Sequence, residues 1–383
     1  MRIAMLGHKR VPSREGGVEI AIEELAVRMA AQGHEVTCYN RMGHHVSGKQ
    51  FDGGQQREFK GVRLRYVPVI NLKGIAAMTA SFFAAVRAGF GRYDVVHFHT
   101  EGPCAMMWLP KLLGKRCVAT IHGLDHQRSK WGGFAKRYIL FGEKVAVHCA
   151  DEIIVLSKSA QRYFEDVYGR QTQLIPNGLP QMERRGAELI EKTFGLKKDG
   201  YILYLGRITP EKGLDYLLEA YPQVVTDKKL VIAGGSSDTR EYFEQLKAKA
   251  AANDNILFTD FVQGQMLEEL YSNAYLYVLP SDLEGMPISL LEALSYGNCC
   301  LVSDIPENAD VVGDCGRVFE HGNVSALAQQ LQQLSDGTEE VVRYRTLVRE
   351  RMETMFNWDD VTAETLRLYK TDRAVDESAQ KSV

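Results

Sequence analysis

Short apolar runs alternate with helical patterns along the whole chain, and the alternation occurs twice. In the amino-terminal half the strand-like runs are 2–7, 35–39, 61–69, 94–99, 117–122 and 152–156. In the carboxyl-terminal half they are 201–205, 229–233, 256–258, 274–279 and 299–302. Because parallel strands need long crossover connections, usually helices, this pattern predicts an α/β protein. We expect two doubly wound, Rossmann-like parallel sheets facing a cleft, with ligands at the carboxyl ends of the strands.

The length of 383 residues agrees with two domains. Weak patterning after residue 178 places the linker there, which predicts domains at 1–180 and 181–356. An amphipathic segment at 357–370 is expected to pack back on the first domain. The polar tail, 371–383, is expected to be disordered.

Charge is distributed unevenly between the halves, although the net charge is only −3. Residues 1–180 hold 25 Lys and Arg against 15 Asp and Glu, a formal charge of +10, whereas the remainder carries −13. A basic half favours an anionic partner such as a membrane surface, and it is equally consistent with an ordinary solvated surface. The apolar stretch 74–87 predicts a buried or interfacial helix. No nucleic-acid partner is expected.

Cysteine usage and the amino terminus bear on localisation. The seven cysteines are scattered and odd in number, without a Cys-x-x-Cys pair, which is typical of a reducing cytosol. The first seven residues are broken by glycine too early for a signal peptide, and no run reaches 18 apolar residues. We therefore expect a cytoplasmic protein that also binds peripherally to the inner face of the membrane.

The stretch 281–292 contains the first candidate site. It follows a buried strand and carries Glu284 before Pro287, where a helix is expected to begin, and Glu292 one to two turns inside it. The free N–H groups of a helix start and its dipole suit an anion such as a diphosphate. Taken alone, the two carboxylates also fit a solvated loop and an ordinary helix.

A second candidate loop spans 205–213. Thr209 is a plausible helix cap and Pro210 a plausible first helical residue, which places Arg207 in the loop and Lys212 in the first turn. Two cations at a helix start oppose its dipole, so they are better explained by an anion between them than as surface charges.

Two more loops follow strands of the first half. Gly16 and Gly17 precede a helix, and paired glycines let backbone approach a phosphate closely; a flexible turn would have the same residues. The loop 120–125 ends a strand with His122 beside glycine. A histidine there can approach a ligand, although a lone histidine is more often structural.

The order and spacing of these motifs resemble family 4 retaining glycosyltransferases of the GT-B fold. The resemblance covers nearly the whole chain and is most specific at Gly206–Gly213 and Glu284–Glu292. The segment His8–Glu19 is similar to bacterial, rhamnosyltransferase-like members that build cell-surface polysaccharides.

The resemblance implies roles for individual residues. Arg207 and Lys212 would bind the donor diphosphate, Glu292 the ribose and Glu284 the sugar, while His122 would stabilise positive charge near the anomeric carbon. The residues implied in catalysis are His122, Glu284, Arg207 and Lys212, with Asp125 as an acceptor-side candidate. Those implied in donor binding are Gly16, Gly17, Arg207, Lys212, Val262, Glu284, Gly285, Met286, Pro287, Ile288 and Glu292.

The function expected from the resemblance is transfer of a sugar, with retention, from a nucleotide diphosphate sugar, a UDP-sugar foremost, to a lipid-linked or polysaccharide acceptor. No Asp-x-Asp motif occurs, so no metal and no cofactor beyond the donor is expected. Two alternatives stay open, a nucleotide-sugar epimerase and a non-catalytic nucleotide-sugar sensor or scaffold.

Overall fold

The computed structural model describes residues 1–14, 16–42, 55–70, 72, 75–127, 132–179, 182–235, 239–352, 355 and 357–370. These residues form two compact units. The first holds the described part of 1–178 together with the last helix, and the second holds the described part of 179–355. The tail 371–383, Glu15 and Gly74 lie outside the described residues.

The first unit is built on an eight-stranded sheet with the order β3-β4-β2-β1-β5-β6-β7-β8 among its described residues. Its strands pair in parallel except for the short edge strand β3, which is antiparallel to β4. The strands are β1 (Arg2–Leu6), β2 (Glu35–Arg41), β3 (Glu58–Phe59), β4 (Val62–Val67), β5 (Val95–His99), β6 (Arg116–Ile121), β7 (Glu152–Val155) and β8 (Gln173–Leu174).

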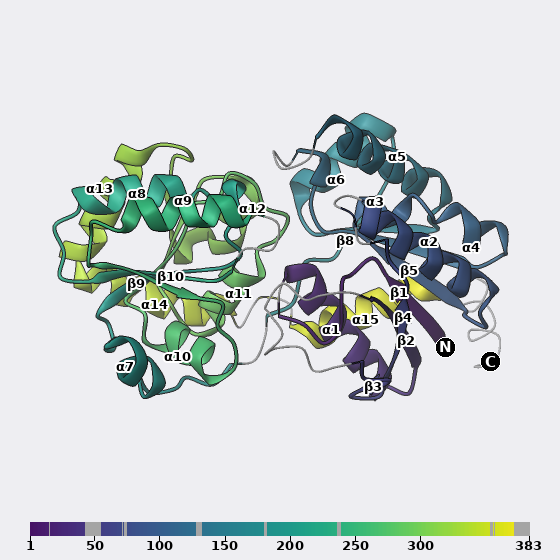
Figure 1. Cartoon of the computed structure of the whole chain (residues 1–383), viewed down its shortest axis with the longest axis horizontal. Coiled ribbons are helices and arrows are strands. Elements are labelled where there is room, and N and C mark those ends of the chain that lie inside the picture. Colours follow the sequence, from purple (N-terminus) through teal and green to yellow (C-terminus); the bar gives the residue numbers. More distant parts are fainter. Residues whose placement is uncertain are drawn as a thin grey trace, which may run out of the picture. The chain divides into compact units, whose positions relative to one another are not determined.

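Helices cover both faces of this sheet (Figure 1). The helices of one face are α2 (Ile75–Phe90), α3 (Glu101–Cys104), α4 (Trp108–Leu112), α5 (Gly133–Cys149) and α6 (Lys158–Tyr168). On the other face α1 (Gly17–Ala31) packs beside α15 (Trp358–Tyr369). Central strands are therefore buried on both sides, as a doubly wound sheet requires.

The last helix joins the first unit through specific contacts. Its start is capped by Asn357, whose side chain accepts from two backbone N–H groups in a capping box. At its other end the hydroxyl of Tyr369 lies 2.5 Å from Nδ1 of His97, a buried side chain of strand β5. Arg28 of α1 forms an ion pair with Asp359 at 2.8 Å. The chain therefore passes through the second unit and returns to the first.

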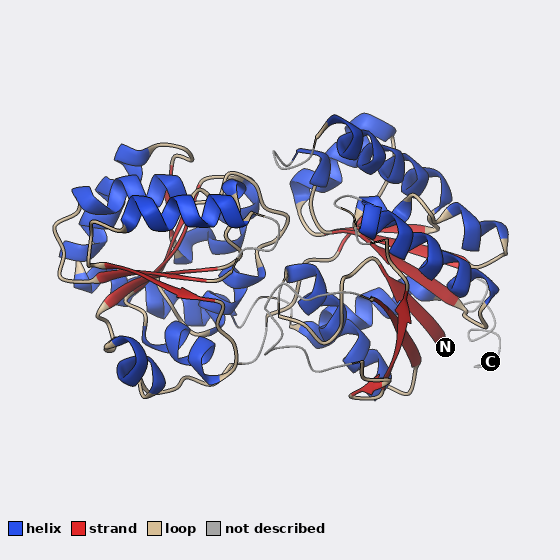
Figure 2. Ribbon diagram, in the orientation of Figure 1, coloured by secondary structure: helices blue, strands red, loops and turns tan. Residues whose placement is uncertain are grey.

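The second unit contains a six-stranded parallel sheet with the order β11-β10-β9-β12-β13-β14. Its strands are β9 (Tyr201–Leu205), β10 (Lys229–Ala233), β11 (Ile256–Asp260), β12 (Leu276–Leu279), β13 (Cys300–Ser303) and β14 (Arg317–Phe319). Figure 2 shows helices on both faces of this sheet as well. Its α-helices are α7 (Leu189–Phe194), α8 (Leu214–Ala220), α9 (Arg240–Ala250), α10 (Gln265–Asn273), α11 (Ile288–Ser295), α12 (Pro306–Val312), α13 (Val324–Asp336) and α14 (Thr338–Met352).

Local predictions failed where a helix was expected to start at a proline. Pro210 opens only a 3₁₀ turn, η3 (Pro210–Lys212), and α8 begins after Gly213. Gly213 has a φ of +66°, and a Cβ there would lie 2.0 Å from the carbonyl oxygen of Pro280, so close packing between two loops interrupts the helix. Thr209 stands at the cap position without a side-chain cap hydrogen bond. Pro287 is the cap residue of α11 and not its first residue.

The strand orders place the loops after β1 and β9 at the switch points of the two sheets, whereas His122 follows β6, two strands from β1. Strand β1 lies between β2 and β5, and β9 lies between β10 and β12, so the crossovers on the two sides of each strand run in opposite directions. In open α/β sheets, the loops that leave such strands at their carboxyl ends diverge and form a crevice, and ligands bind in this crevice. Among the described residues, no helix is both long and apolar enough to span a bilayer.

Candidate functional site

In the second unit, the loops after β9 and β12 bring the predicted charged residues together. The two strands are neighbours in the sheet, with Tyr277 beside Leu203. The Tyr204 hydroxyl donates to the carbonyl of Arg207 at 2.8 Å and fixes that backbone. The half-buried guanidinium of Arg207 has no hydrogen bond or ion pair with any residue that the structure describes.

Lys212 and Glu284 form a buried ion pair, with Nζ 2.5 Å from Oε1. Their side chains are 10% and 7% exposed. The Ser281 hydroxyl donates to the same carboxylate oxygen at 2.6 Å, and Ser303 donates to the Ser281 carbonyl at 2.5 Å. The sequence predicted Lys212 for a phosphate and Glu284 for a sugar. The structure shows the two side chains bound to each other, which keeps both in place.

Glu292 lies on the second turn of α11, buried among aromatic side chains. Its Oε2 accepts from the hydroxyl of Tyr271 at 3.1 Å, and the Tyr271 ring lies 6.0 Å from that of Tyr277. Tyr277 in turn donates to Ser289 at 3.0 Å. Burial, with the nearby charge of Glu292, raises the pKa of Tyr271 far above its usual value, so its hydroxyl stays protonated as a donor.

The start of α11 supplies backbone donors to the same edge of the sheet. Pro287 caps the helix in an extended conformation without a side-chain hydrogen bond. The first N–H groups of a helix have no acceptor within it, and its dipole adds partial positive charge there. Gly285, Met286 and Ile288 flank this start, whereas Val262 follows β11, two strands away from β9.

In the first unit, His122 follows β6 and belongs to a row of imidazoles. Its Nε2 lies 3.0 Å from Nδ1 of His99, and the ring of His99 lies 4.1 Å from that of His97. Burial lowers the pKa of His122 to about 4, against the opposing charges of Asp125 and Glu19. The His122 imidazole is therefore neutral near pH 7, when it can donate or accept a hydrogen bond.

The loop after β1 is held by buried polar contacts. His8 Nε2 lies 2.9 Å from Asn40 Oδ1, which also accepts from the N–H of Val11 at 3.0 Å. Gly16 caps α1 without a side chain, and Gly17 is the first residue of that helix. Glu19 in the first turn accepts from the N–H of Lys9 at 3.0 Å. This loop thus ends at a helix start without a side-chain cap at Gly16, and the expected approach of a phosphate to it stays a prediction.

Several residues of these sites were not predicted. In the sequence, nothing distinguishes Tyr271 and Tyr277 from ordinary core aromatic residues. Only the fold shows that they lie beside Glu292. His97 and His99 carried a usable signal, because residues two apart on a strand share one face. The pairing of β5 with β6 then places His99 beside the strand that ends at His122. Helix α5 and its buried Glu143 were missed entirely.

Comparisons with known proteins agree with this architecture. The sequence model of the family Glycosyltransferase Family 4 matches residues 15–181, and that of Glycosyl transferases group 1 matches residues 187–351. Between them the two matches cover most of the chain, one in each unit.

Three individual proteins extend these matches. The uncharacterized glycosyltransferase MJ1607 of Methanocaldococcus jannaschii is 26% identical, over 97% of this chain and 98% of its own length. The O-antigen chain mannosyltransferase B of Escherichia coli is 30% identical over 46% of this chain and 47% of its own length. The structure of Anabaena Alr3699/HepE in complex with UDP-glucose superposes with a TM-score of 0.78 and 16% identity, over 96% of this chain and 99% of the other. This chain belongs to the glycosyltransferases of the group 1 and family 4 type, with the GT-B fold.

Proposed function

We propose that this enzyme transfers a sugar, with retention of configuration and without a metal on the donor, from a nucleotide diphosphate sugar to a saccharide or lipid-linked acceptor. The observation that carries the proposal is that the loops of Arg207, Lys212 and the start of α11 follow neighbouring strands, β9 and β12, at the switch point of the second sheet, where Lys212 pairs with Glu284. A UDP-sugar is the first donor to test, since the Anabaena structure holds UDP-glucose.

Charge development in the reaction explains why these groups would be needed. Glycosyl transfer separates a nucleoside diphosphate, which gains negative charge, from an oxocarbenium-like sugar. Fixed positive charge at the leaving group is then the largest stabilisation available. Arg207 offers a guanidinium that can grip phosphate oxygens bidentately, and Lys212 adds a point charge. The N–H groups at the start of α11 supply further donors without side-chain reorganisation.

The carboxylates of the second unit would hold the two ends of the donor. Glu292 would accept from ribose hydroxyls while Tyr271 keeps it oriented. Glu284 would accept from sugar hydroxyls, and donor binding then requires Lys212 to turn from Glu284 towards the diphosphate. Val262 is proposed to contact the base through its backbone.

Residues of the first unit complete the proposal. A neutral His122 adds no positive charge beside an oxocarbenium-like sugar, and its carbonyl and ring nitrogen can stabilise that charge. Gly17 is proposed to approach the donor phosphate, and Asp125 to orient the acceptor hydroxyl. With no protein nucleophile assigned, we propose that the acceptor attacks from the front face and the departing phosphate takes its proton.

A lipid-linked acceptor and a site on an anionic membrane surface belong to the same proposal. Helix α2 exposes Phe82, Phe83 and Phe90, which are 44%, 38% and 76% exposed. Its last turn carries Arg87, and the first half of the sequence is basic. Exposed aromatic residues beside basic ones are typical of membrane-surface helices. If the protein does not sediment with anionic liposomes at low salt, or if Phe82→Ser and Phe83→Ser together leave sedimentation unchanged, this part of the proposal is wrong.

The decisive experiment screens nucleotide sugars by thermal shift and then measures transfer with the donor that stabilises the protein. We expect Arg207→Ala and Lys212→Ala each to lower turnover on the order of 100-fold, as loss of a leaving-group donor does. Lys198→Ala, at an exposed position of the second unit, is the matched control and should leave turnover unchanged. Full turnover in both site variants refutes the proposal. Release of a free nucleotide with the sugar on an acceptor also excludes an epimerase, which leaves the nucleotide–sugar bond intact.

A further inference from the structure

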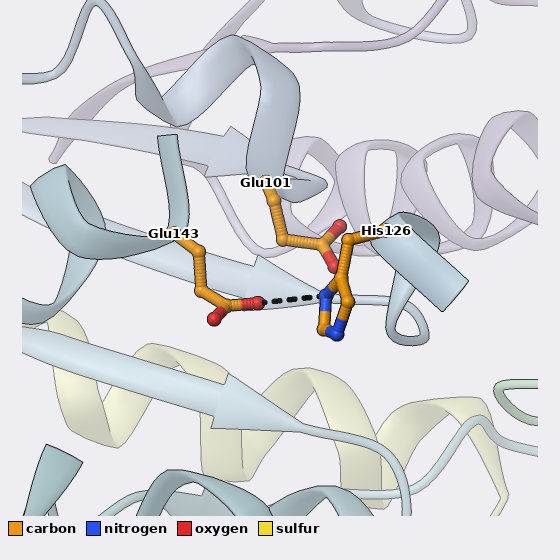
Figure 3. A group of neighbouring side chains, drawn as sticks. All are labelled: Glu101, His126 and Glu143. Atoms are coloured by element: carbon orange, nitrogen blue, oxygen red, sulfur yellow. Dashed lines mark ion pairs between the residues drawn. The ribbon is translucent and has the colours of Figure 1, made fainter. Parts of the chain in front are cut away.

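Two buried glutamates and a partly buried histidine of the first unit converge at a place that the proposed reaction does not use. Glu101 starts α3, His126 lies on the 3₁₀ turn η2 (Asp125–Gln127), and Glu143 lies on α5. Figure 3 shows the carboxyl groups of Glu101 and Glu143 near the same part of the His126 ring, with a dashed line for the ion pair between Glu143 and His126. One ligand atom from each residue lies within 4.8 Å of the other two.

Close packing of two helices creates this convergence. A Cβ at Gly142 would lie 2.0 Å from the carbonyl oxygen of Glu101, so α5 approaches α3 backbone to backbone. The next residue, Glu143, is thereby buried beside Glu101, and both are 0% exposed. Two carboxylates removed from water at one place need a compensating positive charge or protons.

The hydrogen bonds leave one oxygen of each carboxylate directed at the cluster. Oε1 of Glu101 accepts from the N–H of Asp125 at 2.8 Å, and Oε1 of Glu143 accepts from the hydroxyls of Tyr163 and Tyr168 at 2.8 and 2.5 Å. The remaining atoms, Oε2 of Glu101, Oε2 of Glu143 and Nδ1 of His126, are buried and have no hydrogen-bond partner among the described residues. Metal ligands are typically oriented in this way, with outer groups fixing one atom and the other left for the ion.

The spacing of these atoms suits a metal better than a hydrogen bond. Nδ1 of His126 lies 3.4 Å from Oε2 of Glu143, beyond the usual N–H···O length of about 2.7–3.2 Å. Two ligands at about 2.1 Å from a tetrahedral ion lie about 3.4 Å apart. The third ligand atom, from Glu101, lies within 4.8 Å of the other two.

From this geometry we infer that Glu101, His126 and Glu143 bind a divalent transition-metal ion, with Zn²⁺ as the first candidate. One imidazole and two carboxylates make a donor set that Zn²⁺ accepts, whereas Mg²⁺ and Ca²⁺ prefer oxygen ligands alone. The ion neutralises the buried carboxylates and ties η2 to α3 and α5. Since η2 follows the loop of His122 by a few residues, the metal is a positioning element for that loop and not a ligand of the donor phosphates.

The test measures metal binding by the full-length, chelator-stripped protein without any nucleotide sugar, so it does not depend on the proposed reaction. Titration with ZnCl₂, followed by calorimetry and elemental analysis of the dialysed protein, should give one tightly bound equivalent. His126→Ala should weaken binding by at least about 100-fold, since even outer-shell changes cost 10- to 100-fold. His148→Ala removes an exposed histidine of α5 and should leave this equivalent intact.

Two further variants keep the inference falsifiable if one protein is unstable. Glu101→Gln preserves shape and removes a ligand charge, so it should also abolish the tight equivalent. Tyr168→Phe removes a hydrogen bond to Glu143 and should lower the affinity for Zn²⁺ by about 10-fold. Circular dichroism should show that the fold of this variant is intact. The inference is overturned if the wild type binds no Zn²⁺ tightly, or if His126→Ala binds Zn²⁺ as tightly as the wild type. The contact between His126 and Glu143 is then only an ion pair.

Discussion

The ion pair between Lys212 and Glu284 gives a prediction that separates its structural role from its functional one. Lys212→Met removes the ammonium but keeps most of the side-chain volume. Glu284, whose side chain is 7% exposed, then keeps the hydrogen bond from the Ser281 hydroxyl at 2.6 Å but loses the ammonium that balanced its charge. Removing one partner of a buried pair typically costs about 3–5 kcal/mol, because the other charge is left uncompensated.

The double variant Lys212→Met, Glu284→Gln removes both charges, so most of that loss should return. Replacing a buried pair by neutral groups of similar volume is often close to neutral. We therefore expect about 3–5 kcal/mol of destabilisation in Lys212→Met and a recovery of at least about 2 kcal/mol in the double variant. The effects of the two substitutions should therefore not add, because Lys212 and Glu284 are in direct contact.

The assay is urea unfolding, combined with hydrogen exchange to assign the change to β9 and β12 of the second unit. The same variants also report on the donor site. Glu284→Gln releases Lys212 from its carboxylate, so UDP without a sugar should bind more tightly while transfer slows. The reasoning is refuted if Lys212→Met costs less than about 1 kcal/mol and its effect simply adds to that of Glu284→Gln.

Further predictions concern pH and backbone packing. Burial lowers the pKa of His97 to about 3, so as the pH falls this histidine is protonated in the unfolded chain before it is protonated in the folded protein. The stability this histidine contributes is complete above pH 6.5 and is lost as the pH falls. Denaturant titrations should show a loss of stability between pH 7 and pH 5 that is about 2 kcal/mol smaller in His97→Gln than in the wild type, because other buried histidines contribute to the rest. His122, with a pKa of about 4, should give no inflection near pH 6.5 in the pH–rate profile of transfer. Glu269 accepts from the N–H groups of residues 188–190 at 2.7–3.1 Å, so Glu269→Gln should cost about 1–2 kcal/mol at pH 7. Its pKa is lowered because those bonds outweigh burial, so the difference should shrink as the pH falls below 4.5. Gly213→Ala should destabilise the second unit by at least about 2 kcal/mol, measured by urea unfolding, through a positive φ and a clash with the carbonyl of Pro280.

Most strands could be predicted because buried parallel strands are short, nearly continuous apolar runs bounded by polar loops. The predicted run 201–205 coincides with β9, and 229–233 with β10. Helix α5 escaped prediction because its amino-terminal turns are mixed in polarity, and its buried face is set by contact with α3. The start of α8 was misplaced because a proline signal cannot show that another loop passes 2.0 Å from a glycine.

The residues of the candidate site could be predicted only where a local sequence pattern marks them. Charged residues in loops after apolar runs, such as Arg207 and Glu284, can be recognised from their position along the chain. Their partners cannot, because Tyr271 lies 21 residues from Glu292, and Lys212 lies 72 from Glu284. The roles proposed for these residues in donor binding remain predictions.

The sequence by itself determined the α/β class, the two-part division and the loops that carry charge, since these depend on patterns that repeat within a few residues. Tertiary structure alone decided which of those charges meet. Strand order and the close contacts of glycines bring distant side chains together, and burial then fixes their protonation. That is why the pair of Lys212 with Glu284, and the cluster of Glu101, His126 and Glu143, became visible only in the folded chain.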